Sequence, residues 1–206
     1  MIIDQCKRCR RLRQKLFLKG ERCFSQKCAI IRKPYPPGFK SKRRFGSLSE
    51  YGRQLVEKQK IKALYGLSER QLKNYFKKAI LKKGQQGPSD VLLSLLEGRM
   101  DSVIFSLGWS SSRRQARQIV NHGLILVNGK TAKIPSQQIK VEDALRIKKI
   151  KSYLFKDLDQ RLKTKKSPSW LSLDKDGVSA KVIKLPVFGE LEVNVDMPLI
   201  IEYFSK

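Results

Sequence analysis

Apolar residues recur at helical spacing in the first half of the chain, and they predict a series of helices. Residues 47–65, 68–84 and 88–98 each open on a residue that favours a helix start and close at or just before a glycine. Ser47 with Glu50, and Ser68 with Gln71, have the spacing of a capping box. We therefore expect a helical domain over residues 47–90. Residues 196–206 complete it, because their short apolar helix would dock back on it rather than stay exposed to water.

Residues 99–148 predict a helix–helix–hairpin module. A first helix spans residues 99–108, and a second begins at Ser112, with Gln115 completing a capping box. Strand 124–127 leads into Asn128-Gly129, a strong hairpin signal, and the chain returns through residues 130–133. A further strand fits residues 144–148. The first helix carries an apolar stripe made of Met100, Val103, Ile104 and Leu107.

The last third of the chain mixes helix and strand. Residues 150–164 are helix-compatible and very basic, and the apolar residues 170–173 are expected to pack on the module. Residues 179–185 and 190–195 alternate apolar and polar side chains, as half-buried strands do. The expected fold class is α+β with a mainly antiparallel sheet. An inserted α/β domain, residues 91–195, carries the module, and residues 1–46 form a separate cysteine-rich segment with a basic arm.

The net charge of the chain indicates what kind of partner it binds. Lys and Arg number 45 against 18 Asp and Glu, a formal net charge of +27. Such an excess favours a polyanion, and because basic residues are spread over the whole chain, nucleic acid is the first interpretation. No apolar run reaches the roughly 18 residues that a membrane span needs. The N-terminus has no signal-peptide core. We therefore expect a cytoplasmic protein that binds neither a membrane nor a small-molecule substrate.

Three arginines gather at the start of the second helix of the module. Arg113, Arg114 and Arg117 are expected together on its outward side, where like charges repel and oppose the helix dipole. An anion bound there would explain the arrangement. Phosphate is the natural candidate, because free backbone N–H groups at a helix start also point at it. A solvated charged face is the alternative interpretation.

A proline-rich segment, residues 31–47, predicts an extended arm that becomes ordered on RNA. Pro34, Pro36 and Pro37 disfavour regular structure, and interleaved aromatic rings could stack on bases. A disordered linker is the alternative. The basic side chains of this arm, which we expect to contact RNA, are Lys40, Lys42, Arg43 and Arg44.

All four cysteines lie near the N-terminus. Cys6, Cys9, Cys23 and Cys28 follow the spacing Cys-x2-Cys-x13-Cys-x4-Cys, which suits a tetrahedral zinc ion held by four thiolates. Because disulfides are rare in the cytosol, we expect one zinc ion per chain, with each close pair forming a knuckle. An iron–sulfur cluster uses the same ligands and stays open as an alternative, as do four unrelated reduced cysteines.

The module resembles a small RNA-binding module named after small ribosomal subunit protein four (S-four). The resemblance is carried by Arg99-x-Asp101, Ser112-Arg113, Ala116-Arg117 and the turn Val127-Asn128-Gly129-Lys130. Over nearly the full length, the order of segments is similar to the bacterial family of that ribosomal protein. The segments are a cysteine-rich start, a YPPG arm, LSEYGRQL, the LE-x-R-x-D opening of the module, P-x-W-L and a final LIIEYFSK. Many members of the family lack the cysteines, so the family role does not need metal.

The resemblance implies a structural, non-enzymatic constituent of the small ribosomal subunit. It implies a primary binder of small-subunit ribosomal RNA that nucleates assembly of the 5′ domain. It also implies a position near the messenger RNA entry path, beside small-subunit protein five, and a contribution to translational accuracy. Within the module we expect RNA contacts from Arg99, Arg113, Arg114, Arg117, His122, Asn128 and Lys130. Two of these residues have an alternative explanation: His122 could simply end its helix, and Asn128 would form the hairpin with or without RNA.

Two other classes of function stay open on the sequence alone. An RNA-modifying enzyme can carry the same module, although no carboxylate cluster or Gly-rich phosphate loop stands out beside it. A zinc-containing DNA-binding regulator would prefer duplex DNA to folded RNA. An assay for RNA modification tests the first class, and a competition between duplex DNA and folded RNA tests the second.

Overall fold

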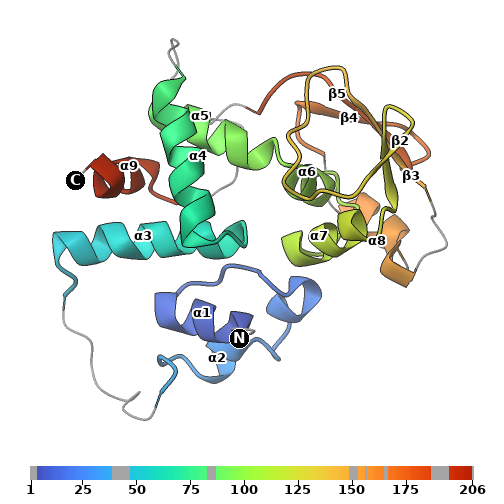
Figure 1. Ribbon diagram of the computed structural model, residues 1–206. Coiled ribbons are helices and arrows are strands. Elements are labelled where there is room, and N and C mark those ends of the chain that lie inside the picture. The colour runs from blue at the N-terminus through green and yellow to red at the C-terminus, as the bar shows by residue number, and fades with distance from the viewer. Residues whose placement is uncertain are drawn as a thin grey trace. The chain divides into compact units, whose positions relative to one another are not determined.

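The chain divides into two units (Figure 1). The structure is a computed structural model that describes residues 4–38, 47–82, 87–148, 153–155, 157–164, 167–186 and 195–205. Unit 1 comprises Met1–Lys78 and Val193–Lys206, and unit 2 comprises Ala79–Glu192. In these described ranges, none of the helices combines the length and the apolar character that crossing a membrane requires.

Unit 1 is built from helices. A small apolar cluster connects its N-terminal segment to the first long helix, with Cys9 and Leu16 packed against Ala63. The described elements are α1 (Gln5–Leu12), the 3₁₀ turn η1 (Gly20–Cys23), α2 (Ala29–Arg32), α3 (Glu50–Leu64), α4 (Glu69–Leu81) and α9 (Met197–Ser205). The last residues of α4 extend into the range of unit 2.

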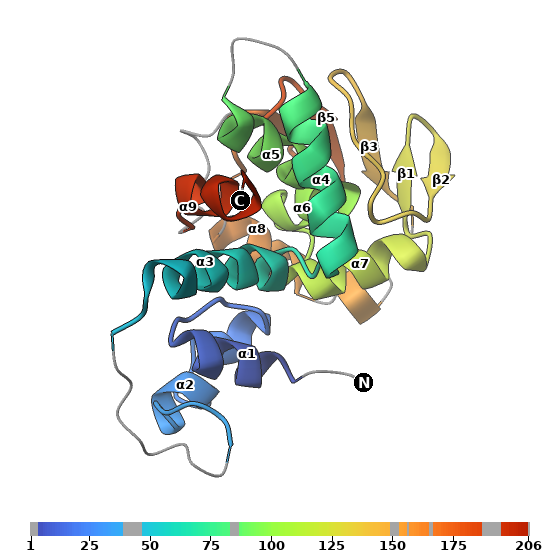
Figure 2. The same ribbon diagram turned by 60° about the vertical axis from the view of Figure 1, so that its left-hand side comes forward.

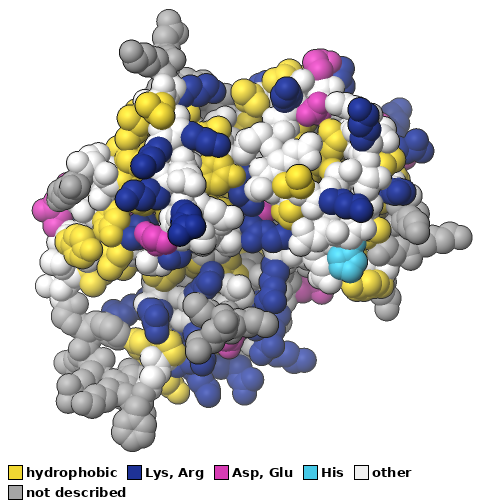
Figure 3. Space-filling view, viewed as in Figure 1, with side chains coloured by type: hydrophobic (Ala, Val, Ile, Leu, Met, Phe, Trp, Pro, Cys, Tyr) yellow, Lys and Arg dark blue, Asp and Glu magenta, His cyan; other side chains and the backbone are white. Residues whose placement is uncertain are grey.

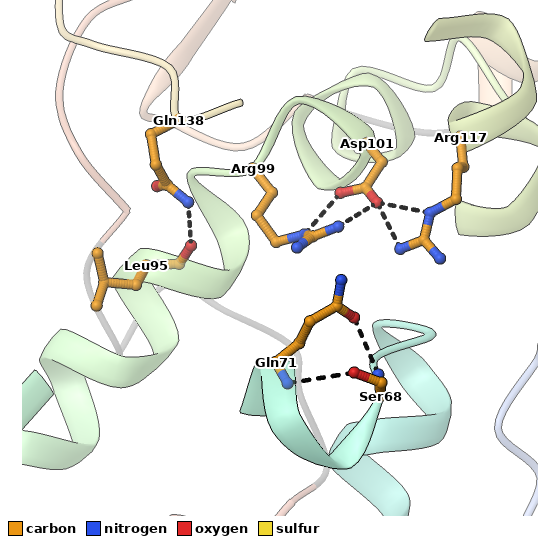
Figure 4. Close-up of polar contacts among 7 residues, drawn as sticks. All are labelled: Ser68, Gln71, Leu95, Arg99, Asp101, Arg117 and Gln138. Atoms are coloured by element: carbon orange, nitrogen blue, oxygen red, sulfur yellow. Dashed lines mark hydrogen bonds and ion pairs between the residues drawn. The ribbon is translucent and has the colours of Figure 1, made fainter. Parts of the chain in front are cut away.

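Serine side chains cap both long helices of unit 1, but only one cap lies where the sequence predicts it. At α4, the Gln71 N–H donates to Ser68 Oγ at 3.2 Å, and the Ser68 N–H donates to Gln71 Oε1 at 3.0 Å (Figure 4). This is the predicted capping box. The box predicted at Ser47 is wrong by two residues. Ser49 caps α3 instead, because its Oγ accepts a hydrogen bond from the Gly52 N–H at 3.2 Å.

The C-terminal helix docks on the rest of unit 1, as predicted from its apolar side chains. α9 lies against α3 in both views (Figures 1 and 2). Tyr203 OH accepts a hydrogen bond from Lys58 Nζ at 2.9 Å, and Phe204 stacks on Phe76 with ring centroids 4.7 Å apart. Ile200 is 0% exposed. Docking therefore covers the apolar surface that a free helix would leave in water.

Unit 2 combines short helices with an antiparallel sheet. Its described strands are β1 (Ile125–Val127), β2 (Lys130–Ala132), β3 (Ala144–Ile147), β4 (Leu171–Leu173) and β5 (Ser179–Val182), in the order β2-β1-β3-β5-β4. The helices are α5 (Pro88–Glu97), α6 (Met100–Ser106), α7 (Arg113–Asn121), the 3₁₀ turn η2 (Tyr153–Phe155) and α8 (Leu158–Thr164). The expected α+β class and antiparallel sheet are confirmed.

One apolar core fills unit 2. The stripe predicted on α6 is buried, with Met100, Val103 and Ile104 each 0% exposed. These side chains pack with the inward-facing residues of the sheet, and Trp109 and Trp170 belong to the same core. Because each aliphatic side chain of this size contributes about 1.5–3 kcal/mol when buried, the core fixes α6 and α7 against the sheet.

The predicted hairpin joins β1 to β2. Asn128 and Gly129 have left-handed backbone conformations, with φ of 48° and 78°. A two-residue type I′ turn needs positive φ at both positions, which explains the Asn-Gly pair. The register places Val127 opposite Lys130 on β2 and opposite Leu145 on β3.

The C-terminal part of unit 2 differs from the sequence prediction in one place. A single helix over residues 150–164 is wrong for the described part of that range, since η2 and α8 are separate short pieces. Residues 150–152 and 156 lie outside the described residues. Their buried side chains Leu154, Phe155 and Leu158 join the core, so tertiary packing overrides local helix preference. The apolar residues 170–173 pack on the module core as predicted, and Leu171–Leu173 do so as a strand at the edge of the sheet. Most of the strand predicted at 190–195 lies outside the described residues.

Candidate nucleic-acid interface

The start of α7 fixes the directions of the three arginines predicted to bind phosphate. Ser112 Oγ accepts a hydrogen bond from the Gln115 N–H at 3.3 Å, as the predicted capping box requires. The reciprocal bond goes to the preceding residue, because Gln115 Oε1 accepts from the Ser111 N–H at 2.7 Å. The first turn of α7 is therefore held from both sides.

Asp101 is the centre of a buried ion-pair network (Figure 4). Arg99 donates to it through Nε, 2.9 Å from Oδ1, and through Nη2, 2.8 Å from Oδ2. Arg117 on α7 donates to Oδ2 through Nε at 3.1 Å and Nη2 at 2.8 Å. The Asp101 and Arg99 side chains are each 3% exposed. This carboxylate links the start of α6 to the middle of α7.

Backbone contacts hold Arg99 in place. It precedes α6, and the loop before β3 runs alongside it in an isolated antiparallel bridge with Gln138. Gln138 Nε2 donates to the Leu95 carbonyl at 3.0 Å (Figure 4), and the Ile139 N–H donates to the Gly98 carbonyl at 2.9 Å. These bonds join α5, α6 and the loop around the arginine.

Arg113 makes a second ion pair inside unit 2. Its Nη2 lies 2.7 Å from Glu97 Oε1, and the Glu97 side chain is only 2% exposed. The Arg113 guanidinium also lies over the Phe105 ring, 4.7 Å from its centroid. Cation–π contact and ion pair together orient this side chain toward α5 and α6.

The expectation of three outward-facing arginines on α7 is therefore wrong for two of them. Arg113 and Arg117 retain 21% and 35% side-chain exposure, while each is paired with a buried carboxylate. Arg114 is the exposed member of the set. The physical reason is long-range pairing: Glu97 and Asp101 supply the anions that the sequence argument sought in phosphate. Whether these arginines also contact RNA stays a prediction.

The other predicted contact residues of the module lie at separate places. His122 is the C-terminal cap of α7 and is exposed, eight residues or about 12 Å along the helix from Arg114. Lys130 is exposed on β2. Asn128 supports the fold: its Nδ2 donates to Asp143 Oδ1 at 2.8 Å, and its Oδ1 accepts from the Ala144 N–H at 2.9 Å. The expected contacts thus border α7 and the hairpin rather than forming one cluster.

Sequence reasoning missed the basic residues on the outer face of the sheet. Arg146 alternates with the buried Leu145 and Ile147, so it points away from the core. Lys148 follows at the next outward position, and its Nζ donates to Thr131 Oγ1 on β2 at 3.4 Å. Alternation within the predicted strand was the available signal, since every second residue of a half-buried strand faces solvent.

Positive charge extends beyond these residues. Figure 3 shows Lys and Arg side chains over much of the face in view, with few Asp and Glu among them. The predicted contact residues of the arm, Lys40, Lys42, Arg43 and Arg44, lie outside the described residues. The preceding stretch is held by Arg10, whose Nε donates to the Tyr35 carbonyl at 2.9 Å and whose guanidinium lies 4.9 Å from the Tyr35 ring centroid.

The cysteines come from three elements of the N-terminal segment. Cys6 and Cys9 lie on α1, Cys23 ends η1 and Cys28 precedes α2, so the first pair is helical rather than a knuckle turn. Burial raises the pKa of the Cys9 thiol, which a hydrogen bond from the Leu16 backbone lowers and the other three cysteines raise. Among the described residues, no three His, Cys, Asp or Glu side chains are already arranged to hold a metal ion.

A capped helix pair, a tight hairpin and a strongly basic surface define an RNA-binding protein of α+β fold. The model of the family described as "Ribosomal protein S4/S9 N-terminal domain" matches residues 3–97, and the model of the "S4 domain" family matches residues 98–145. The chain belongs to the uS4 family of small ribosomal subunit proteins.

Relatives named small ribosomal subunit protein uS4 resemble the chain over almost its whole length. Those of Syntrophomonas wolfei, Thermus thermophilus and Caldicellulosiruptor bescii are 43%, 44% and 45% identical to it. Each match covers 203 residues, which is 98% of this chain and 96% of the relative. The resemblance read from the sequence is thus confirmed for the family.

Proposed function

We propose that this chain is a structural, non-enzymatic constituent of the small ribosomal subunit that binds ribosomal RNA in the cytoplasm. The observation that carries the proposal is identity of 43% to 45% with uS4 relatives over 98% of the chain. A net charge of +27 supports it, because a folded polyanion would neutralise that charge.

The finer role that we propose is that of a primary binder. The chain would bind small-subunit ribosomal RNA early and nucleate assembly of the 5′ domain. It would lie near the messenger RNA entry path beside small-subunit protein five and contribute to translational accuracy. Physical support comes from rigidity: buried ion pairs and one apolar core hold the module's basic surface in a fixed outline. Such a surface suits recognition of RNA by its shape.

The basic residues of the module divide into exposed ones and ones that are paired with buried carboxylates. Arg114 and Lys130 are exposed and are proposed to contact phosphates, together with His122 and the basic arm. Arg99 and Arg117 hold Asp101, and Arg113 holds Glu97. Their first role is to position α7, so they act on RNA binding mainly through the fold.

Filter binding to a small-subunit ribosomal RNA transcript over a range of salt concentrations tests this division. Arg114→Gln and Lys130→Gln should each weaken binding and reduce the slope of log K against log salt by about 1. Their urea unfolding curves should stay unchanged. Arg117→Gln is the matched control: it should lose stability as well as affinity, because Asp101 loses one of its two partners.

The outcomes separate the levels of the proposal. Wild-type binding no tighter to ribosomal RNA than to duplex DNA of equal length would contradict the function itself. Wild-type binding with unchanged slopes for Arg114→Gln and Lys130→Gln would leave the function standing and show that the contact surface lies elsewhere.

We also propose that Cys6, Cys9, Cys23 and Cys28 hold one zinc ion. The chemistry of the residues supports a thiolate site: Cys9, Cys23 and Cys28 are buried, and the Lys19 N–H donates to Cys23 Sγ at 3.4 Å. The other three cysteines each affect the pKa of Cys9, so the four thiols lie within electrostatic reach of one another. When bound, zinc would cross-link α1 to the η1 turn, in a segment with little apolar core of its own.

Elemental analysis of protein purified under reducing conditions tests the zinc proposal. One zinc per chain is expected, falling to a small fraction in Cys9→Ser. The control is Ser25→Ala, at an exposed position of the same segment, and this variant should keep its metal. Iron with a visible absorbance band would indicate an iron–sulfur cluster instead. Metal-free protein whose N-terminal segment is still folded, as shown by slow hydrogen exchange, would contradict any metal site.

A further inference from the structure

Two phenylalanines are exposed side by side in the N-terminal segment. Phe17 is 43% exposed and Phe24 is 75% exposed. Their ring centroids lie 4.9 Å apart with an interplanar angle of 29°, which is a stacked arrangement. An exposed ring alone is unremarkable, but a stacked pair presents a flat apolar surface to solvent.

The backbone is strained where it presents the first ring. Phe17 has φ of 49°, a left-handed conformation that bulky residues rarely adopt. Its neighbours Leu16 and Leu18 pack into the cluster with Cys9. The chain therefore turns the larger phenylalanine outward between one buried leucine and one partly buried leucine. Hydrophobic burial alone would favour the opposite choice, and strain of this kind is concentrated at functional sites.

The segment that carries the ring pair is basic. Residues 15–28 contain four basic side chains, Lys15, Lys19, Arg22 and Lys27, against one acid, Glu21. Lys15 Nζ lies 5.8 Å from the Phe17 ring centroid. Arg22 and Lys27 are exposed within three residues of Phe24. A flat apolar surface bordered by cations matches a nucleotide, which offers an aromatic face and a phosphate together.

We propose that Phe17 and Phe24 form a stacking platform for an unpaired base of the small-subunit ribosomal RNA. This inference rests on the proposed function and adds a base-contacting site outside the S4 domain. The outer face of Phe24 takes the base, and the neighbouring basic side chains take the flanking phosphates. Phe17 supports Phe24 from behind. RNA is favoured over a protein partner because Lys15 lies beside the Phe17 ring and the exposed Arg22 and Lys27 flank Phe24 in the sequence, whereas a protein-binding apolar patch is depleted in lysine.

The experiment compares two replacements of Phe24 in the chain as purified under reducing conditions. Phe24→Leu keeps an apolar side chain but removes the ring, and it should weaken binding to a small-subunit ribosomal RNA transcript about fivefold or more. The slope of log K against log salt should not change, because no charge is lost. Phe24→Trp keeps an aromatic face and should bind as well as wild type. Tyr153→Leu, which removes a ring that is 71% exposed in unit 2, is the matched control and should have no effect.

The Phe24→Trp variant also reports the contact directly. Trp109 and Trp170 are 0% and 1% exposed, so iodide should quench mainly the new indole. Bound transcript should protect it from iodide and quench its emission by stacking.

Each outcome decides the proposal. Phe24→Leu binding like wild type, or Trp and Leu variants losing affinity equally, would overturn the platform while leaving ribosomal RNA binding intact. The same follows if Tyr153→Leu loses as much, or if the new indole is protected only after other ribosomal proteins are added, which would indicate a protein surface. A wild-type chain that ignores the transcript would overturn the proposed function and the platform together.

Discussion

Each unit contains a carboxylate held between two cations, and the two sites differ mainly in exposure. In unit 2, Asp101 binds Arg99 and Arg117, and its side chain is 3% exposed. In unit 1, Glu69 binds Lys58 and Lys62, and its side chain is 52% exposed. The charge pattern is the same, but only the carboxylate of unit 2 is removed from water.

The difference shows what each site can do for the fold. A buried carboxylate with two guanidinium partners specifies how α6 and α7 pack, because breaking it would leave charge without compensation in the interior. Glu69 can exchange its lysines for water at little cost. Lys58 differs from Glu69: its side chain is only 6% exposed, and it also contacts Tyr203 on α9. The predictions below test this ranking.

The largest effect is expected from Asp101→Asn. The substitution keeps the size of the side chain but removes the negative charge, so Arg99 and Arg117 lose the anion that compensates them. The free energy of unfolding of unit 2 should fall by about 3–5 kcal/mol. Urea unfolding followed by the emission of the buried Trp109 and Trp170 measures it.

Glu142→Gln is the matched control for that measurement. Glu142 pairs with Lys181 in the same unit, but the two side chains are 69% and 56% exposed. Its loss should change stability by less than about 0.5 kcal/mol. Equal effects of the two substitutions would mean that burial does not distinguish these ion pairs, and the comparison would fail.

A smaller loss is expected from Arg117→Gln. This change removes the partly exposed partner and leaves Asp101 bound to Arg99. Losing hydrogen bonds to a charged group costs about 1.5–3 kcal/mol. The same urea experiment should place this variant between wild type and Asp101→Asn. A loss as large as that of Asp101→Asn would show that Arg117, not the carboxylate, is the essential member.

How far the sequence led depends on whether the signal was local. The Ser68–Gln71 cap, the stripe on α6 and the Asn128-Gly129 turn are set by residues within a few positions of one another, and all three were predicted correctly. The cap at Ser47 failed because two serines compete two residues apart, and only the helix register decides between them. The prediction of one helix across η2 and α8 failed because the burial of their side chains in the core decides where each piece lies.

The candidate site was harder to predict than the fold. The cluster of arginines on α7 was correctly located, but its orientation was not. Arg117 binds a carboxylate 16 residues away and Arg113 binds another at the same separation, and neither pairing leaves a periodic trace in the sequence. Charge counts also do not distinguish an arginine that holds a fold from one that is free to reach a phosphate. The structure makes this distinction: Arg114 is exposed on α7, and Arg146 faces solvent between two buried residues of β3.

Within unit 1, Lys58→Met should have a larger effect than its exposed surroundings suggest. Lys58 Nζ donates to Glu69 and to Tyr203 OH, and it lies 4.1 Å from the Tyr203 ring centroid. Although burial lowers the pKa of Lys58, its hydrogen bonds to Glu69 and Tyr203 raise it overall. Methionine keeps the packing but loses these contacts, about 1–2 kcal/mol together.

Hydrogen exchange of α9 amides measures that loss, because Lys58 connects α9 to α3. Lys62→Met is the control, since Lys62 shares Glu69 with Lys58 but, unlike Lys58, is not a partner of Tyr203. Faster exchange in Lys58→Met alone is expected. The same acceleration in both variants would assign the effect to Glu69 rather than to the docked helix.

The smallest effect concerns the pH dependence of Glu69. Hydrogen bonds from Lys58 and then Lys62 lower the pKa of Glu69 below its ordinary value of 4.5, with burial opposing them. A carboxyl whose pKa is lowered by folding stabilises the native state above the unfolded pKa, and the contribution is lost as pH falls through the lowered value. Because Glu69 is 52% exposed, solvent screening limits the contribution to roughly 0.2–0.5 kcal/mol.

Protection of α9 amides from hydrogen exchange should therefore be greater in wild type than in Glu69→Gln at about pH 6, and the difference should shrink below about pH 4. Glu21→Gln, at an exposed position of η1, should show no such difference at either pH. A gap between wild type and Glu69→Gln that persists in acid would mean that Glu69 supports α9 through its shape rather than its charge.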